Sequence, residues 1–286
     1  MAFGYRIPNT APHQACGDWL VSELQRHGAA VTQQQGTMTN YAGHALPLRN
    51  IIAHYPGTTP YSILLCAHWD TRPWSDEEED YDNRFLPVPG ANDGASGVGI
   101  LLEIARQLHA LQRTDQAAQL PTIDIIFFDA EDMGTPNHYT GPERQYTWCL
   151  GSQFWAKQYA SMPANQRTKY QYGILLDMVG DPSATFPREY FSVNYAGNYV
   201  EQIWRTAAKL GYSRYFVNQL AYPITDDHYY INTIAGIPCV DIIDYKTNNG
   251  TGFAEWWHTQ KDDMRNINKQ TLQAVGETVI TTICSK

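Results

Sequence analysis

Short, largely apolar segments recur along this chain between longer segments of helical periodicity, and this alternation constrains the fold more than any other feature. The apolar segments span residues 46–54, 62–67, 123–128, 172–176 and 239–243. The helical segments span residues 14–27, 97–111, 152–159, 199–210 and 269–283, with a short one after residue 226. Strands that are apolar throughout are buried on both faces, and helical crossovers join parallel strands. The sequence therefore predicts an α/β fold with a largely parallel sheet covered on both faces.

Length and charge restrict the class of protein further. The 286 residues contain no internal repeat or low-complexity linker, so we expect a single domain over residues 1–286. Because 29 acidic residues outnumber 20 Lys and Arg, the net charge is −9, which argues against nucleic acid as a partner. The longest apolar stretch is far shorter than the roughly 20 residues that cross a bilayer, so we expect no membrane span. The five scattered cysteines predict neither a disulfide framework nor a zinc ribbon.

Acidic residues and a histidine stand at the C-terminal ends of the predicted strands. They are His68 and Asp70 after 62–67, Asp129, Glu131 and Asp132 after 123–128, Asp177 after 172–176, and Asp244 after 239–243. In open α/β sheets, ligands bind outside the carboxyl ends of the strands, so we expect these side chains to converge. No Lys or Arg directly adjoins these strand ends, and buried carboxylates without a counter-charge are costly. The sequence therefore predicts that a divalent metal compensates the acids.

Each candidate residue also has a purely structural interpretation. His68 could be a hydrogen-bonded structural histidine, and Asp93 could cap the helix that follows it. Glu131 and Asp132 could be solvated loop acids, and His258 could be a core histidine beside aromatic residues. All of these structural explanations would have to be true independently of one another, whereas one metal site accounts for all of the residues together.

Two carboxylates and one histidine form a ligand set that is typical of catalytic zinc, because a fourth position stays open for water or substrate. Neighbouring residues on an extended backbone point in different directions. One member of the Glu131 and Asp132 pair can therefore bind metal while the other acts as a general acid/base. This division of roles favours amide chemistry.

Five segments, in this order, resemble the superfamily of zinc aminopeptidases and glutaminyl-peptide cyclotransferases. They are LCAHWD at 65–70, GANDGASG at 90–97, FFDAED at 127–132, LLDMVG at 175–180 and WHT at 257–259. Further features are more similar to the cyclotransferases, the animal-type glutaminyl cyclases and their bacterial relatives. These features are Trp257 before the histidine, DDH at 226–228 upstream of GIP at 236–238, and DD at 262–263. The resemblance covers residues 15–283.

The resemblance implies a central mixed, mostly parallel sheet flanked by helices, as in zinc aminopeptidases, and one zinc ion per chain. It implies conversion of the N-terminal glutamine of peptides or proteins to pyroglutamate with release of ammonia. Carried over onto this sequence, it assigns Asp93, Asp132 and His258 as zinc ligands. Family members usually act outside the cytoplasm, so it also implies a periplasmic or secreted protein, and we expect a monomer.

The same resemblance assigns the remaining site residues. Glu131 is the general acid/base, with Asp177 and Asp226 in an acidic hydrogen-bond network beside it. Trp257, and Trp148 from the long loop 133–149, form apolar walls for the substrate. Asp241 stands where the animal enzymes tend to have a histidine, and we expect it at the substrate.

The main alternative is an aminopeptidase with two zinc ions, in which water attacks the peptide bond. His68 and Asp177 could hold a second metal with Asp93 bridging, and Asp70 would orient His68 in either case. A binding domain of the same fold without activity would have lost ligands, and none is missing here. Zinc stoichiometry and an assay for ammonia release separate the two enzymatic hypotheses.

Overall fold

The computed structural model describes residues 3–114, 120–246 and 250–285, and a six-stranded sheet lies at its centre. The strands run in the order β1-β2-β4-β3-β5-β8. They are β1 (Ala30–Thr39), β2 (Ala45–Tyr55), β3 (Ser62–His68), β4 (Thr122–Phe128), β5 (Tyr170–Asp177) and β8 (Cys239–Ile243). β2 pairs antiparallel with both β1 and β4, whereas β4, β3, β5 and β8 run parallel to one another. The predicted mixed, mostly parallel sheet is confirmed.

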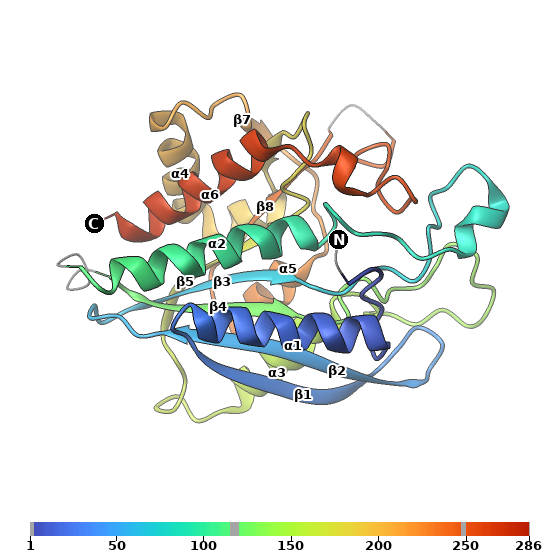
Figure 1. Cartoon of the computed structure of the whole chain (residues 1–286), viewed down its shortest axis with the longest axis horizontal. Coiled ribbons are helices and arrows are strands. Elements are labelled where there is room, and N and C mark those ends of the chain that lie inside the picture. Colours follow the sequence, from blue (N-terminus) through green and yellow to red (C-terminus); the bar gives the residue numbers. More distant parts are fainter. Residues whose placement is uncertain (1–2, 115–119, 247–249, 286) are drawn as a thin grey trace.

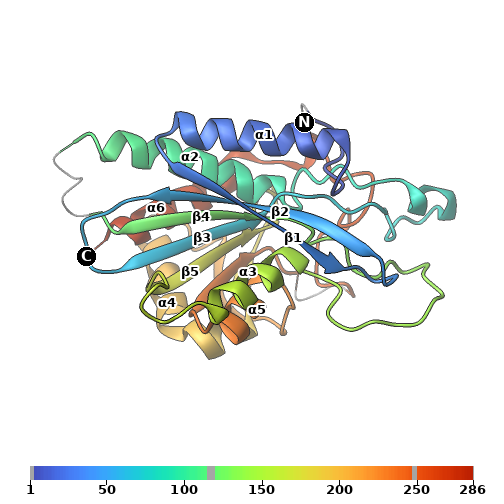
Figure 2. The same cartoon turned by 90° about the horizontal axis from the view of Figure 1, so that it is seen from below.

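Helices cover both faces of this sheet, as Figures 1 and 2 show. One face carries α1 (Ala11–Arg26), α2 (Ala95–Leu111) and α6 (Lys269–Cys284), and the other carries α3 (Leu150–Ser161) and α5 (Asp227–Tyr230). α4 (Tyr190–Lys209) contacts α6 and β8, and the small sheet of β6 (Phe186–Arg188) and β7 (Phe216–Leu220) lies against it. Short turns of helix occupy Tyr81–Phe85, Ile231–Ala235 and Met264–Asn266. Over the described ranges, no helix combines the length and the apolar character needed to cross a membrane.

Alternate side chains of the central strands enter two separate cores. From β3, Ile63, Leu65 and Ala67 join the core that includes α1 and α2 residues, whereas Leu64 and Cys66 join the core on the α3 side. Each of these five side chains is buried. A slip of one residue would exchange the two faces, so this packing fixes the register of the strands. It also fixes the positions of the C-terminal strand ends, where the polar residues stand.

Several elements differ from the sequence-based expectation, and among them the small sheet of β6 and β7 was not predicted. β1 carries the mostly polar sequence AVTQQQGTMT, which has no apolar alternation, and its backbone pairs with β2 at the edge of the sheet. α4 begins at Tyr190 rather than at residue 199, because the Glu189 carboxylate accepts hydrogen bonds from the backbone N–H groups of Phe191 and Ser192. The five cysteines are all free, in agreement with the absence of a disulfide framework.

Close contact between α2 and the sheet leads to a testable expectation for stability. A Cβ atom added at Gly97 would lie 2.2 Å from the backbone oxygen of Leu176 and 3.0 Å from Ala67 Cβ, neither of which can move freely. We expect Gly97→Ala to lower the free energy of unfolding by ~1–3 kcal/mol, measured by urea denaturation. Gly99→Ala on the same helix meets no atom within 4 Å and is the matched control. Since alanine favours helix, that control should gain ~0.5–1 kcal/mol; equal stability of the two variants would contradict the packing argument.

Candidate metal centre and active site

Three predicted metal ligands from distant parts of the chain meet beyond the C-terminal ends of the parallel strands. Asp132 follows β4, Asp93 precedes α2, and His258 lies in the segment between β8 and α6. Their ligand atoms lie within 4.8 Å of one another. His258 Nε2 is 3.2 Å from Asp132 Oδ1 and 3.5 Å from Asp93 Oδ2. The structure therefore brings the three side chains close enough to share one ion.

The chemistry of this group fits zinc. All three side chains are buried, and Asp132 Oδ2 has no hydrogen-bond partner among the described residues. Asp93 does not cap α2, because the N-cap residue is Gly94 and no side chain caps that helix end. Two carboxylates and one imidazole are donors that zinc accepts, and they leave a coordination position open. These residues can hold a zinc ion with room for a substrate atom.

A buried arginine beside the site corrects the expectation that these acids have no cation nearby. Arg72 Nη1 lies 3.8 Å from Asp132 Oδ1 and donates a hydrogen bond of 3.1 Å to the Asp132 carbonyl oxygen. The Arg72 guanidinium also donates to both carboxylate oxygens of Asp76, at 2.8 and 2.6 Å. Metal is thus not the only counter-charge at this end of the sheet. Arg72 follows the end of β3 by four residues, so it does not directly adjoin the strand end.

Each predicted ligand contacts a buried aspartate that lies outside the ligand set. For His258 this aspartate is Asp76. Asp76 Oδ1 lies 3.6 Å from His258 Nδ1, the ring nitrogen that does not face Asp93 and Asp132. Although burial opposes it, Arg72 and His258 hold the pKa of Asp76 well below its usual range. A carboxylate behind a ligating histidine fixes its tautomer and ring orientation. Sequence reasoning missed Asp76, because it lies in the acidic run 76–80, which is typical of a solvated loop.

The two carboxylate ligands are held through their backbones. The Asp70 carboxylate accepts the N–H groups of Glu131 and Asp132, at 3.0 and 3.1 Å. The Asp262 carboxylate accepts the N–H groups of Asn92 and Asp93, at 2.7 and 3.0 Å. Asp70 thus does more than the expected orientation of His68, whose Nδ1 lies 3.5 Å from Asp70 Oδ1. These contacts set the directions of the Asp93 and Asp132 side chains.

We expect Asp76→Asn to weaken zinc binding while the fold is kept. The amide cannot pair with Arg72 as a charge, and it holds the His258 ring less firmly. Loss of such an outer partner typically reduces metal affinity ~10–100-fold, which competition with a chelator measures. The exposed Glu79 lies in the same loop, so Glu79→Gln is the matched control and should bind zinc as the unmodified chain does. An unchanged zinc affinity in Asp76→Asn would remove the residue from this supporting role.

Glu131 does not belong to the ligand set, and it lines a cavity. The cavity has a volume of about 540 Å³, and its wall includes the three candidate ligands, Glu131, Asp177 and Asp226. Burial, reinforced by the carboxylates of Asp132 and Asp226, raises the pKa of Glu131 well above its usual range. Burial likewise raises the pKa of Asp177, to about 7, with contributions from Asp93 and Asp226. A carboxyl group with a raised pKa beside a cavity is suited to taking and returning a proton near neutral pH.

Aromatic rings enclose the cavity on the side of His258. The Trp257 ring stacks on the His258 ring at 3.7 Å between centroids, and the Trp148 ring lies parallel to it at 6.0 Å. Both tryptophans line the cavity, with Phe191, Tyr229 and other aromatic residues. Arg72 lies over the Trp148 ring at 4.5 Å from its centroid. The loop that carries Trp148 is therefore attached to the metal centre through a cation–π contact.

Asp241 does not lie where we expected it. Its carboxylate is fully buried in β8, 3.4 Å from His228 Nδ1, and is not part of the cavity wall. On the other side of the same ring, His228 Nε2 lies 3.0 Å from Glu189 Oε2. Ile243 lies on the same face of β8 but two residues nearer its C-terminal end, so it reaches the cavity, whereas Asp241 lies deeper in the sheet beside His228. The expectation that Asp241 lies at the substrate is therefore corrected, because its side chain lies behind the cavity wall.

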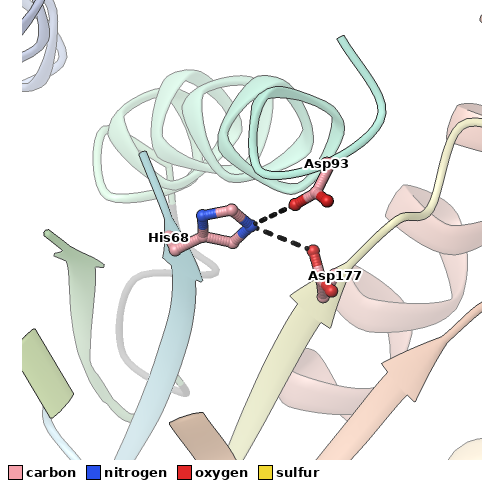
Figure 3. Close-up of side chains that lie close together, drawn as sticks. All are labelled: His68, Asp93 and Asp177. Carbon is pink, nitrogen blue, oxygen red and sulfur yellow. Dashed lines mark ion pairs between the residues drawn. The ribbon is translucent and has the colours of Figure 1, made fainter. Parts of the chain in front are cut away.

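A second group of possible ligands shares Asp93 with the first. His68 Nε2 lies 2.9 Å from Asp93 Oδ1 and 3.3 Å from Asp177 Oδ1, and Figure 3 shows the ring pointing at both carboxylates. The ligand atoms of these three residues also lie within 4.8 Å of one another. The geometry that the two-zinc hypothesis requires is thus present. In the structure, the imidazole itself contacts both acids directly.

Left-handed backbone conformations concentrate at this site. Ala130, Cys149, Met178 and His258 have φ angles of 55°, 55°, 49° and 53°. Residues other than glycine adopt such angles at a cost, and proteins retain them mainly where function requires a particular side-chain direction. Here Ala130 precedes Glu131 and Met178 follows Asp177. His258 is itself a candidate metal ligand. No sequence signal marked them, since none is a glycine or asparagine.

The chain belongs to Peptidase family M28, because the model of that family matches residues 50–283. It is 48% identical to Tannerella forsythia glutaminyl cyclase, with a TM-score of 0.92, covering 100% of this chain and 94% of that structure. It is 49% identical, with a TM-score of 0.92 and the same coverage, to a structure from Parabacteroides distasonis ATCC 8503 described as a Zn-dependent exopeptidase. Bovine glutaminyl-peptide cyclotransferase is 26% identical over 95% of this chain and 76% of its own length. The predicted family resemblance is confirmed.

Proposed function

We propose that this chain is a zinc-dependent glutaminyl-peptide cyclotransferase that converts N-terminal glutamine of peptides or proteins to pyroglutamate and releases ammonia. The observation that carries the proposal is Glu131, a half-buried carboxyl group that lines the cavity directly beside a complete zinc set and takes no part in it. The likeness to glutaminyl cyclases over the whole chain supports it.

Asp93, Asp132 and His258 would hold a zinc ion, which would supply a Lewis acid for the negative charge that develops on the substrate γ-carbonyl oxygen. Glu131 accepts a proton from the substrate α-amine, whose pKa is near 8, as the nitrogen forms its bond to the γ-carbon. The bond from that carbon to the amide nitrogen then breaks, and Glu131 returns the proton to the leaving ammonia. The acid/base group therefore ends the cycle in its starting state.

The other residues of the cavity position the substrate. Asp177 and Asp226 lie in the wall with Glu131, where their carboxyl groups can accept hydrogen bonds from the α-amine. Trp257 and Trp148 offer apolar surface to the glutamine methylenes. A five-membered ring closes readily, with effective concentrations of roughly 10⁵ M or more, so positioning and charge stabilisation are what the protein must add.

The rival activity is hydrolysis by two zinc ions, and the group of His68, Asp93 and Asp177 is the observation that favours it. We propose one ion per chain instead, because the chain resembles glutaminyl cyclases over its whole length and a cyclisation needs no metal-bound water as nucleophile. The likeness to a structure described as a Zn-dependent exopeptidase keeps hydrolysis as the second candidate.

Metal analysis combined with two assays tests the proposed function. We expect one zinc per chain, ammonia release from a Gln-peptide, and no hydrolysis of a Leu-anilide. Two zinc ions per chain with hydrolysis of the anilide would overturn the proposal in favour of the aminopeptidase. A monomeric state and a location outside the cytoplasm remain part of the proposal, and sedimentation and cell fractionation test them.

A further inference from the structure

A thiol lies against the proposed general acid/base. Cys149 Sγ is 3.0 Å from Glu131 Oε1 and donates a hydrogen bond to it. Cys149, Glu131 and Asp226 each offer a ligand atom, and these atoms lie within 4.8 Å of one another. None of the three belongs to the Asp93, Asp132 and His258 set.

The backbone holds this thiol in place. Cys149 has a left-handed φ of 55° immediately before α3, and its N–H donates to the Glu131 carbonyl oxygen at 2.9 Å. The next residue, Leu150, donates to the Ala130 carbonyl oxygen at 3.1 Å. Both contacts attach the start of α3 to the chain segment that carries Glu131. The side-chain direction of Cys149 is therefore fixed rather than accidental.

Several carboxylate oxygens beside these groups have no hydrogen-bond partner among the described residues. Asp226 Oδ2 is buried and has no hydrogen-bond partner within the described part of the chain, and the same holds for both carboxylate oxygens of the adjacent Asp227. Glu131 and Asp226 line the cavity, so an ion can reach them from solvent. A thiolate combined with two carboxylates suits thiophilic divalent ions.

We propose that Glu131, Cys149 and Asp226 form a second cation site that takes a thiophilic divalent ion, such as cadmium or zinc in excess. On binding, the Cys149 thiol loses its proton to solvent and the thiolate becomes a ligand. Burial, and then the surrounding carboxylates, raise the pKa of this thiol well above its usual value. The same negative surroundings attract a dication, which replaces the proton.

Occupancy of this site has a consequence for activity, and this consequence alone rests on the proposed function. Glu131 would be a metal ligand and no longer free to take a proton from the α-amine. An excess of the ion should therefore inhibit ammonia release, although the ion in the Asp93, Asp132 and His258 site stays in place. The second site would make the enzyme sensitive to metal concentration.

Cadmium added to the zinc-loaded protein tests the site. A thiolate bound to cadmium gives an ultraviolet charge-transfer absorption, whereas the sites built on His68 and His258 contain no sulfur. We expect this absorption in the unmodified chain and its loss in both Cys149→Ala and Cys149→Ser. Cys284 is the exposed cysteine, so Cys284→Ala is the matched control and should keep the absorption. Cadmium inhibition should weaken in Cys149→Ala by at least the roughly 10–100-fold seen for lost outer partners.

Zinc content and circular dichroism of each variant establish that it is folded. Absorption that persists in both Cys149 variants, that disappears in Cys284→Ala, or that is absent from the unmodified chain at saturating cadmium overturns the proposal. The absorption requires no turnover. Failure of the proposed cyclotransferase activity therefore leaves this measurement valid, and the two proposals can fail separately.

Discussion

Replacement of His258 by alanine is expected to remove zinc and activity together. The histidine is the neutral ligand of the set, and two carboxylates alone hold zinc poorly. Its ring also packs against Trp257 and lies parallel to Trp148, so its removal loosens the cavity wall. We expect zinc affinity to fall more than ~100-fold and turnover by ~10³-fold or more.

Zinc content after dialysis and the rate of ammonia release measure these two effects. The exposed His44→Ala is the matched control and should retain both zinc and rate. Near-ultraviolet circular dichroism shows whether the core of the variant is intact. A His258→Ala protein that keeps one zinc ion and most of its turnover would place the metal centre elsewhere.

Replacement of Glu131 by glutamine is expected to separate zinc binding from catalysis. The amide has the same shape, and the ligand atoms belong to other residues, so zinc content should stay near one per chain. The amide cannot carry a proton between the amine and the leaving ammonia, and loss of a general acid/base typically costs 10²–10⁴-fold, so kcat should fall by roughly that factor.

Glu103→Gln is a suitable control for this variant, because Glu103 lies on α2 and pairs with Arg106 far from the cavity wall. Steady-state ammonia release and zinc analysis on the same samples provide the comparison. An unimpaired rate in Glu131→Gln would exclude this residue as the proton carrier, whichever reaction the chain performs.

Most of the parallel sheet was predictable, because its strands are apolar on both faces. Residues such as Leu64 and Leu65 enter opposite cores, which leaves no polar alternation to confuse the pattern. β1 was not predictable in this way, because its side chains are largely solvated and its backbone pairing with β2 holds it. Strand pairing through the backbone leaves no trace in the sequence.

That Asp93, Asp132 and His258 form a candidate ligand set was predictable from their residue types and from the motifs that surround them. Their supporting carboxylates were not. Asp76 acts through an imidazole nitrogen, and its sequence surroundings resemble a solvated loop. Asp262 acts through backbone N–H groups, a role that the DD motif at 262–263 did not reveal. The misplacement of Asp241 has a related cause, since how far a cavity extends along a strand depends on the packing of the surrounding elements.

The sequence by itself determined the class of fold, the strand ends at which polar residues gather and the donor types that face one another there. These properties follow from local patterns of apolar and ionisable residues. Only the tertiary structure decided that Arg72 and Asp76 stand behind His258, that Asp241 lies behind the cavity wall, and that Cys149 touches Glu131. Such contacts join residues far apart in the chain, and distances of a few ångströms between them arise only when the sheet, its helices and its left-handed turns are packed together.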